Sequence, residues 1–289
     1  MTDKFQIDFV GIGASKCGTT WLGHMLAGHP QLCMSEPKEV HYFNDRLSFR
    51  SFLKPHFQNG IEWYQNFFSH CGTKLKGEIT PRYSTDPIAA RRIKEHNPDI
   101  KIIYCLRNPV DRIWSHFQFA SHYVGKEDRD IMTAIKEEPE YLLMSRYFSN
   151  LGIYRELFQD EQIFILWFDD IHKRPGELLK EVYTFLGVDA NFQPEKMNKK
   201  SNAARVSRFV HLQKWIRKTN YVLIGMGMAG LIQRMKRAGL NEFVTMINSK
   251  PLVKKPIPAE AKEYIIENVR EDVHQLEKLF NKDLSHWLK

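Results

Sequence analysis

A glycine-rich loop near the N-terminus holds the residues with the clearest chemistry. It reads Gly13-Ala-Ser-Lys16-Cys-Gly18-Thr19-Thr20 and lies between an apolar run at 7–12 and a segment, 19–26, with apolar residues at helical spacing. Two glycines separated by four residues allow a tight loop to direct backbone N–H groups at phosphate oxygens, and the start of a helix adds positive potential. The loop predicts a phosphate-binding site, and a glycine-rich turn that binds nothing is the alternative.

The position of the lysine separates this loop from that of the nucleotide triphosphatases. In those proteins lysine follows the second glycine directly and Ser or Thr comes next, whereas here Thr19 takes that position and Lys16 lies inside the loop. The apolar run at 101–106 ends in Arg107 and not in an acid that would hold Mg²⁺. The sequence therefore retains a phosphate-binding loop with a lysine and lacks the Mg²⁺-binding residues that ATP hydrolysis needs.

A second anion-binding pair is predicted about 90 residues further along the chain. Arg107 follows the buried strand predicted at 101–106, and Ser115 lies two turns into a helix that Pro109 opens. The carboxyl ends of strands are where α/β sheets hold ligands, and a guanidinium fork with a hydroxyl suits a phosphate. A surface ion pair is the alternative for Arg107.

The stretch 36–45 is rich in titratable groups. If it is extended, alternation places Glu39 and His41 on one face. Either residue suits a general base, because imidazole titrates near neutrality and burial raises the pKa of a carboxyl group. The alternative is that both only line an acceptor cleft.

Apolar runs alternate with helical patterns over residues 6–187. This order predicts an α/β fold, a P-loop-like three-layer α/β/α domain whose central sheet is mostly parallel. Residues 191–289 are expected to form a helical C-terminal cap on the same single domain, around a nucleotide-binding core at about 5–190. The apolar, Met- and Gly-rich part at 221–247 is a lid, a peripheral membrane contact or plain core.

Charge and cysteine content limit the classes of partner. The net charge of +8 favours anionic ligands, but there is no helix-turn-helix spacing, zinc finger or RNP-type aromatic run, so nucleic acid is not expected. The four cysteines form no CxxC pair and no Cys/His cluster with zinc spacing, so we expect reduced thiols and no metal. With no signal-peptide pattern at the N-terminus, the expected location is cytoplasmic.

Two of these segments resemble one family. The segment 8–22, which contains the loop, resembles the 5'-phosphosulfate-binding loop of sulfotransferases that use 3'-phosphoadenosine 5'-phosphosulfate (PAPS). The segment 102–117, with Arg107 and Ser115, resembles the family's 3'-phosphate-binding strand and helix. The resemblance covers roughly residues 5–190 and is closest in style to bacterial and glycosaminoglycan-type sulfotransferase domains. It implies PAPS as co-substrate, 3',5'-adenosine bisphosphate (PAP) as product, and no metal.

The resemblance also assigns roles. The glycosaminoglycan branch takes its base from the Glu of a Glu-x-His-Phe-Phe-type segment, which favours Glu39 over His41. The donor-binding residues it implies are Lys16, Cys17, Gly18, Thr19, Thr20, Trp21, Arg107 and Ser115, with Phe168 over the adenine and Ser201, Asn202 and Arg205 in a loop that closes over the 3'-phosphate. A core position is the alternative for Phe168, and a solvated loop is the alternative for the other three.

One segment departs from the family's pattern. In 77–83 the family's substrate-reaching lysine is replaced by Ile79, and either Arg82 compensates or this branch does without that lysine. Glu78 beside it either faces substrate or sits in a buried ion pair.

The sequence thus predicts a sulfotransferase that moves a sulfuryl group from PAPS to a hydroxyl or amine, with Lys16 stabilising the leaving phosphate. A Mg-dependent kinase or NTPase with an aberrant loop is the second hypothesis, and a basic nucleic-acid-binding module is the third. The acceptor stays open among small-molecule, lipid and carbohydrate classes, and the oligomeric state is unknown.

Overall fold

The computed structural model describes residues 5–45, 55–124, 127–195, 197, 205–207, 249–251 and 256–289, with only the backbone for 122–124, 205–207 and 249–251. It divides into two compact units. The first comprises 1–113, 139–199 and 263–289, and the second comprises 114–138 and 200–262. Each unit is described by itself.

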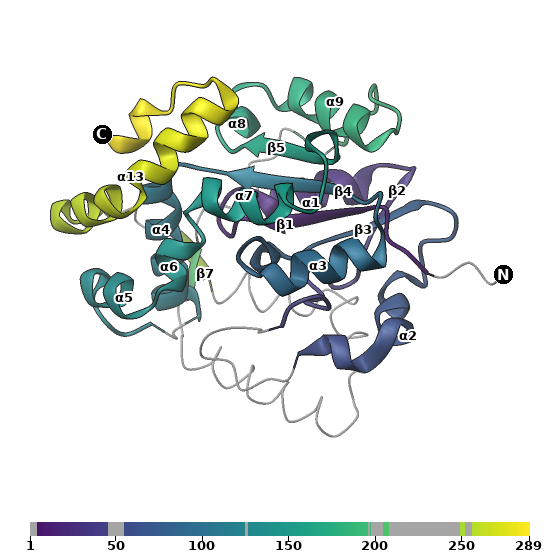
Figure 1. The fold of residues 1–289 in the computed structure, drawn as a ribbon, viewed down its shortest axis with the longest axis horizontal. Coiled ribbons are helices and arrows are strands. Elements are labelled where there is room, and N and C mark those ends of the chain that lie inside the picture. The colour runs from purple at the N-terminus through teal and green to yellow at the C-terminus, as the bar shows by residue number, and fades with distance from the viewer. Residues whose placement is uncertain are drawn as a thin grey trace. The chain divides into compact units, whose positions relative to one another are not determined.

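The first unit is built on a five-stranded parallel sheet (Figure 1). The strands are β1 (Phe9–Gly13), β2 (Leu32–Met34), β3 (Leu75–Ile79), β4 (Lys101–Leu106) and β5 (Ile163–Trp167). Their order is β2-β3-β1-β4-β5, and every pairing is parallel. This confirms the predicted α/β class with a parallel central sheet. Because all five strands run the same way, the loops that follow them gather at one edge.

Helices flank this sheet; α3 and α7 lie on the near face and α1 lies behind it in Figure 1. The described helices of the first unit are α1 (Thr19–Gly28), α2 (Gly60–Gln65), α3 (Pro87–His96), α6 (Glu140–Leu143), α7 (Tyr147–Arg155), α8 (Asp170–Lys173), α9 (Pro175–Leu186) and, from residue 263, α13 (Ala259–Phe280). The division between the units falls within α4 (Pro109–Gln118), and α5 (Ile131–Glu137) belongs to the second unit. The side chain of Asp86 caps α3 by accepting from the N–H groups of Ile88 and Ala89. Gly187 ends α9 in the left-handed region, at φ 77°.

Close packing at the sheet centre explains one glycine. Gly77 on β3 stands opposite Phe9 on β1, and a Cβ built on it would lie 2.2 Å from the Phe9 ring. The fully buried Phe9 ring therefore fills the place that a larger residue at 77 would need.

The region after residue 190 differs from its prediction. The second unit contains two antiparallel strands, β6 (Arg205–Ser207) and β7 (Ser249–Pro251), where only helices were expected. From residue 263 onward α13 belongs to the first unit, where the Asp272 carboxylate accepts from the N–H groups of Phe148 and Ser149 at the start of α7, both at 2.9 Å. Three-residue strands are too short to show a period in sequence. Residues 221–247 lie outside the described residues.

Among the helices in the described ranges, none is both long enough and apolar enough to cross a bilayer.

The prediction that all cysteines are reduced thiols is wrong for two of them. Cys33 on β2 and Cys71, 38 residues later, form a disulfide, whereas Cys17 and Cys105 are free and buried. The fold brings the two backbones to a Cα–Cα distance of 5.5 Å, and no spacing rule reports such a pair.

The cross-link should contribute measurably to stability. Closing a loop of 38 residues corresponds to about 4 kcal/mol in the chain-entropy relation. We expect the Cys33→Ala/Cys71→Ala variant to lose up to about that much free energy of unfolding in urea, relative to the oxidised protein. A reductant should lower the midpoint of the wild type and leave that of the variant unchanged. Equal midpoints for reduced and oxidised wild type would contradict the prediction.

Candidate active site

The predicted donor-binding residues emerge together at the carboxyl edge of the sheet. The glycine-rich loop follows β1, Arg107 follows β4 and Phe168 follows β5. A backbone hydrogen bond from Phe168 N to Leu106 O, 2.8 Å long, continues the pairing of β4 with β5 past the end of the strand. The parallel topology therefore brings residues that are 150 positions apart in the chain to one edge.

The loop after β1 has a shape that its second glycine makes possible. Gly18 has φ +90°, and a Cβ there would lie 2.3 Å from Ile171 Cδ1 and 3.3 Å from the Phe168 ring. Lys16 also adopts a left-handed backbone, at φ 70°. The Cys17 side chain is fully buried beneath the loop, 3.6 Å from the hydroxyl of Tyr147. The loop is thus supported from below in a conformation that a larger residue at 18 could not adopt.

Arg107 joins the two predicted halves of the donor site. Its Nη1 donates to the backbone carbonyl of Lys16 at 3.2 Å, and its guanidinium lies over the Phe168 ring, 4.4 Å from the centroid. The Tyr147 hydroxyl donates to the Arg107 carbonyl at 2.8 Å. The buried Nε of Arg107 finds no acceptor within the described part of the chain. A buried guanidinium N–H of this kind suits an anionic ligand.

The pKa of Lys16 responds to charged residues on both predicted sides of the site, Arg107 on the donor side and Glu39 on the acceptor side. Burial lowers the pKa of the Lys16 ammonium to about 8, and attraction to Glu39 opposes that shift. The positive charge of Arg107 acts in the same direction as burial. The loop lysine therefore lies in a cationic, largely desolvated position between the predicted donor residues and the predicted base.

Glu39 and His41 lie together, although not for the predicted reason. Glu39 Oε2 is 3.8 Å from His41 Nε2, and His41 Nδ1 is 3.0 Å from Asn44 Oδ1. The expectation of an extended segment is wrong, because His41 has φ 59° and no strand forms here. A turn and not strand alternation brings the two titratable side chains to one place. Their catalytic roles stay predictions.

The backbone of this turn is held by a buried carboxylate. Glu78, 0% exposed, accepts hydrogen bonds from the hydroxyls of Tyr64 (2.7 Å), Tyr83 (2.8 Å) and Thr80 (2.8 Å) and from Val40 N (3.1 Å). Burial raises the pKa of Glu78, and these donors oppose the shift. Neither predicted alternative describes Glu78, which is buried away from substrate and is bound by neutral donors.

The same donors reach onward to the next residues of the turn. The Thr80 hydroxyl accepts from His41 N at 3.4 Å, and the Tyr83 hydroxyl accepts from Phe43 N at 3.2 Å. With the bond from Val40 N, three backbone amides between residues 40 and 43 are fixed by Glu78 or its partners. We define these residues as the Glu78 network. This network fixes the position of the backbone that carries Glu39 and His41.

Lys38 is a site residue that the sequence reasoning missed. Its Nζ lies 3.0 Å from Glu39 Oε1, and its positive charge contributes to the lowered pKa of Lys16. A Cβ built on Gly23 would lie 2.9 Å from Lys38 Cδ and 3.6 Å from Ile79 Cδ1, so the lysine stem runs close to the isoleucine. The signal in the sequence was its position next to Glu39 in a cluster of titratable residues.

Arg82, the residue expected to compensate for Ile79, is engaged elsewhere. Its guanidinium forms an ion pair with Glu140 in α6, and its side chain is mostly buried. Lys38 is therefore the cation found beside both Ile79 and Glu39.

The remaining predicted donor residues fall into three groups. Thr19 and Trp21 have buried side chains and Thr20 is exposed at the start of α1, so their backbone N–H groups stay the predicted contacts. Ser115 is on α4 in the second unit, and its relation to Arg107 stays a prediction. Ser201 and Asn202 lie outside the described residues, and Arg205 is described only by its backbone in β6.

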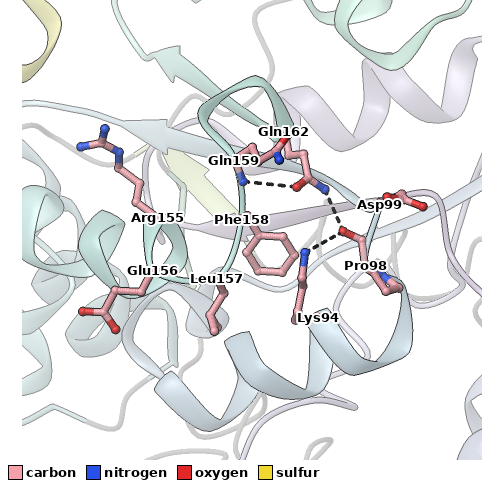
Figure 2. A pocket seen from close by; sticks show the side chains of 9 residues that line it. All are labelled: Lys94, Pro98, Asp99, Arg155, Glu156, Leu157, Phe158, Gln159 and Gln162. Carbon is pink, nitrogen blue, oxygen red and sulfur yellow. Dashed lines mark hydrogen bonds between the residues drawn. The ribbon is translucent and has the colours of Figure 1, made fainter.

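A surface cavity lies at the opposite edge of the sheet from these loops, at the amino ends of the strands. Figure 2 shows this cavity of about 470 Å³, lined by residues that precede β4 and β5, among them Lys94, Pro98 and Gln162. Lys94 Nζ and Gln162 Nε2 both donate to the Pro98 carbonyl at 3.0 Å. Because it sits at the amino ends of the strands and its polar groups bind one another, we do not assign the active site there.

Comparison with known proteins defines the class. A family model described as "Sulfotransferase domain" matches residues 6–220. The membrane-associated sulfotransferase kil1 of Dictyostelium discoideum is 36% identical over 123 residues, covering 41% of this chain and 24% of the relative. The human bifunctional heparan sulfate N-deacetylase/N-sulfotransferase 2 is 25% identical over 201 residues, covering 62% and 22%. The matches thus span about a quarter or less of these curated relatives.

Solved structures show the same fold. A sulfotransferase from Alicyclobacillus acidocaldarius is similar over 99% of this chain and 100% of its own, with a TM-score of 0.70 and 21% identity. The sulfotransferase domain from the curacin biosynthetic pathway is similar over 69% of this chain and 80% of its own, with a TM-score of 0.51 and 18% identity.

The chain belongs to the sulfotransferase domain family. The predicted family is confirmed, and membership in it does not favour the phosphoryl-transfer alternative.

The Glu78 network yields a test of how the acceptor side is positioned. In Glu78→Gln an amide nitrogen replaces one accepting oxygen, so a buried donor loses its partner at a cost of about 1–3 kcal/mol of unfolding free energy. We expect sulfuryl transfer to fall at least about tenfold while PAP affinity is retained, because Arg107 and Tyr147 hold the donor side independently.

Tyr183→Phe is the matched control for this variant. Its buried hydroxyl donates to Met25 O at 3.2 Å, away from the turn, so it should lower stability and leave transfer intact. If Glu78→Gln and Tyr183→Phe have the same transfer rate, the network does not position the site.

Proposed function

We propose that this protein transfers a sulfuryl group from PAPS to an acceptor hydroxyl or amine at the carboxyl edge of its sheet. The observation that carries the proposal is the bond from the Arg107 side chain to the Lys16 backbone carbonyl, which holds one cationic side chain against the loop that carries the other. PAPS carries phosphate at both its 5' and 3' positions, and a donor of that kind needs two separate anion-binding groups. Phe168 beneath the Arg107 guanidinium offers an aromatic surface for adenine.

In this proposal the donor side stabilises charge on the leaving group. The acceptor atom attacks sulfur, the bond from sulfur to the bridging oxygen of the 5'-phosphate breaks, and PAP leaves with the additional negative charge. The Lys16 ammonium and the backbone N–H groups of Gly18, Thr19 and Thr20 are the groups proposed to meet that charge, whereas the predicted donor Cys17 N already donates to Ala14 O at 3.3 Å. Since Lys16 is largely desolvated, its charge acts strongly there.

The acceptor side removes the proton. Glu39 is the proposed general base, and His41, 3.8 Å from it, is the alternative. If the bond to Asn44 Oδ1 is donated by His41 Nδ1–H, the lone pair of Nε2 faces Glu39. Lys38, whose Nζ lies 3.0 Å from Glu39 Oε1, supplies a cation near the transferred group.

The names of the relatives narrow the acceptor. Heparan sulfate N-sulfotransferases act, by their names, on an amine of a carbohydrate, and the other relative is named only as membrane-associated. Together with the exposed Glu39, these names support an acceptor with an aliphatic hydroxyl or amine, in which carbohydrate is the first class to screen.

The lowered pKa of Lys16 predicts a pH dependence for donor binding. Only the protonated lysine attracts phosphate, and with a pKa of about 8 its protonated fraction falls about tenfold between pH 7 and pH 9. The dissociation constant of PAP, measured by calorimetry, should therefore rise about tenfold over that range. Lys16→Arg stays charged throughout and should show a much flatter profile. A flat profile for the wild type would contradict the assignment.

The base can be identified by two substitutions. Glu39→Gln keeps the shape of the side chain and loses its basicity, so we expect turnover to fall about 10²–10⁴-fold with PAP affinity unchanged. His41→Ala should cost less. A normal rate for Glu39→Gln with a large loss for His41→Ala would reverse the two roles. Failure of the wild type to bind PAP at all would refute the proposed function itself.

A further inference from the structure

A second cluster of titratable side chains surrounds the disulfide that joins Cys33 on β2 to Cys71. His70 Nε2 is 3.4 Å from Cys33 Sγ and 4.0 Å from Cys71 Sγ. The same nitrogen is 4.0 Å from Glu36 Oε1. The ligand atoms of Cys33, His70 and Cys71 all lie within 4.8 Å of one another, and we name these three residues the Cys–His cluster. Sequence spacing gave no sign of it, because its members come from segments 37 residues apart.

The backbone that carries this cluster is fixed by hydrogen bonds. Cys33 stands on β2 and pairs with β3. On the other segment Cys71 N donates to Phe68 O at 3.0 Å. The two segments are joined by a bond from Glu36 N to Phe67 O, 3.2 Å long. The ligand-bearing residues are therefore held near one another by the main chain as well as by the disulfide.

We propose that the Cys–His cluster is a metal site of the reduced protein, which binds one thiophilic divalent ion such as Zn²⁺. In the oxidised form the two sulfurs are bonded to each other. A dithiol reductant gives two electrons and two protons to the disulfide and becomes a disulfide itself, which leaves two thiols at Cys33 and Cys71. Zn²⁺ then replaces the two thiol protons and takes the His70 imidazole as its third ligand.

The charges and the exposure of the cluster fit such an ion. Two thiolates neutralise Zn²⁺, and an imidazole with two sulfurs is a donor set that selects zinc over Mg²⁺ or Ca²⁺. The two cysteines are buried, whereas the His70 side chain is 39% exposed, so an ion can enter from the imidazole side. Glu36, at the surface, or a water completes a tetrahedral site. A plain cross-link needs neither the imidazole nor the carboxylate.

Either state ties the same two segments together. The segment between Cys33 and Cys71 contains the turn with Glu39 and His41, so the disulfide and the metal both restrain its two ends. The redox state of the surroundings then decides which restraint is present, the metal under reducing conditions and the disulfide under oxidising conditions. This inference does not depend on the proposed function.

The test is a metal titration of the full chain in both redox states. Chelator-treated protein is reduced with a phosphine and titrated with ZnCl₂ in competition with a chromophoric chelator. We expect one Zn²⁺ per reduced chain and none for the oxidised chain. Titration of the reduced chain with CoCl₂ should produce a thiolate-to-cobalt charge-transfer band.

Variants separate this site from other thiols. His70→Ala should weaken Zn²⁺ binding by at least the roughly 10–100-fold that the loss of an outer-shell partner costs. Cys105→Ala removes a buried free thiol elsewhere and should bind like the wild type. Cys33→Ala/Cys71→Ala should bind no Zn²⁺ and give no charge-transfer band.

Two results would overturn the inference. One is a reduced wild type that takes up no more Zn²⁺ than the double variant, which would leave a structural disulfide only. The other is equal affinity in His70→Ala and wild type, which would exclude the imidazole as a ligand. If His70→Ala does not fold, His70→Gln and the cobalt spectrum of the wild type decide, and absence of the charge-transfer band overturns the proposal.

Discussion

The buried carboxylate of Glu78 is the constraint on which the acceptor side depends. A carboxyl group with no exposure is tolerated only when its oxygens are satisfied, and here four donors converge on it. Two of those donors, the hydroxyls of Thr80 and Tyr83, also accept hydrogen bonds from backbone N–H groups of the turn that holds Glu39. The hydrogen bonds of Glu78 thereby also restrain the backbone of that turn. The location of the predicted base is therefore fixed by the hydrogen bonds of a fully buried carboxylate.

The donor side is organised by a different interaction. Arg107 holds the Lys16 carbonyl and stacks on Phe168, and Tyr147 holds Arg107 in turn. These contacts join three separate loops at the edge of a parallel sheet. The hydrogen bonds of Glu78 and those of Arg107 involve different residues, and the attraction between Lys16 and Glu39 links the two sides electrostatically.

Lys38 shows how a cation can lie beside a position that holds an apolar residue. The position that resembles the family's lysine holds Ile79, and the Lys38 ammonium lies 3.0 Å from Glu39 Oε1. A comparison of motifs position by position does not register this lysine, because it belongs to a different segment of the chain. Arg82, the candidate by sequence proximity, is committed to Glu140.

The sequence by itself determined the parts that depend on local pattern. The apolar runs located strands such as β4 to the residue, the glycine spacing located the tight loop between β1 and α1, and strand-helix alternation defined the parallel sheet and so placed Arg107 at its edge. Tertiary structure alone decided the partners of Glu78, the position of Lys38 and the meeting of Cys33 with Cys71. Those contacts join residues from different segments of the chain, and tertiary packing brings them together. Such packing leaves no periodic pattern or motif in the sequence, so sequence reasoning could not find these contacts.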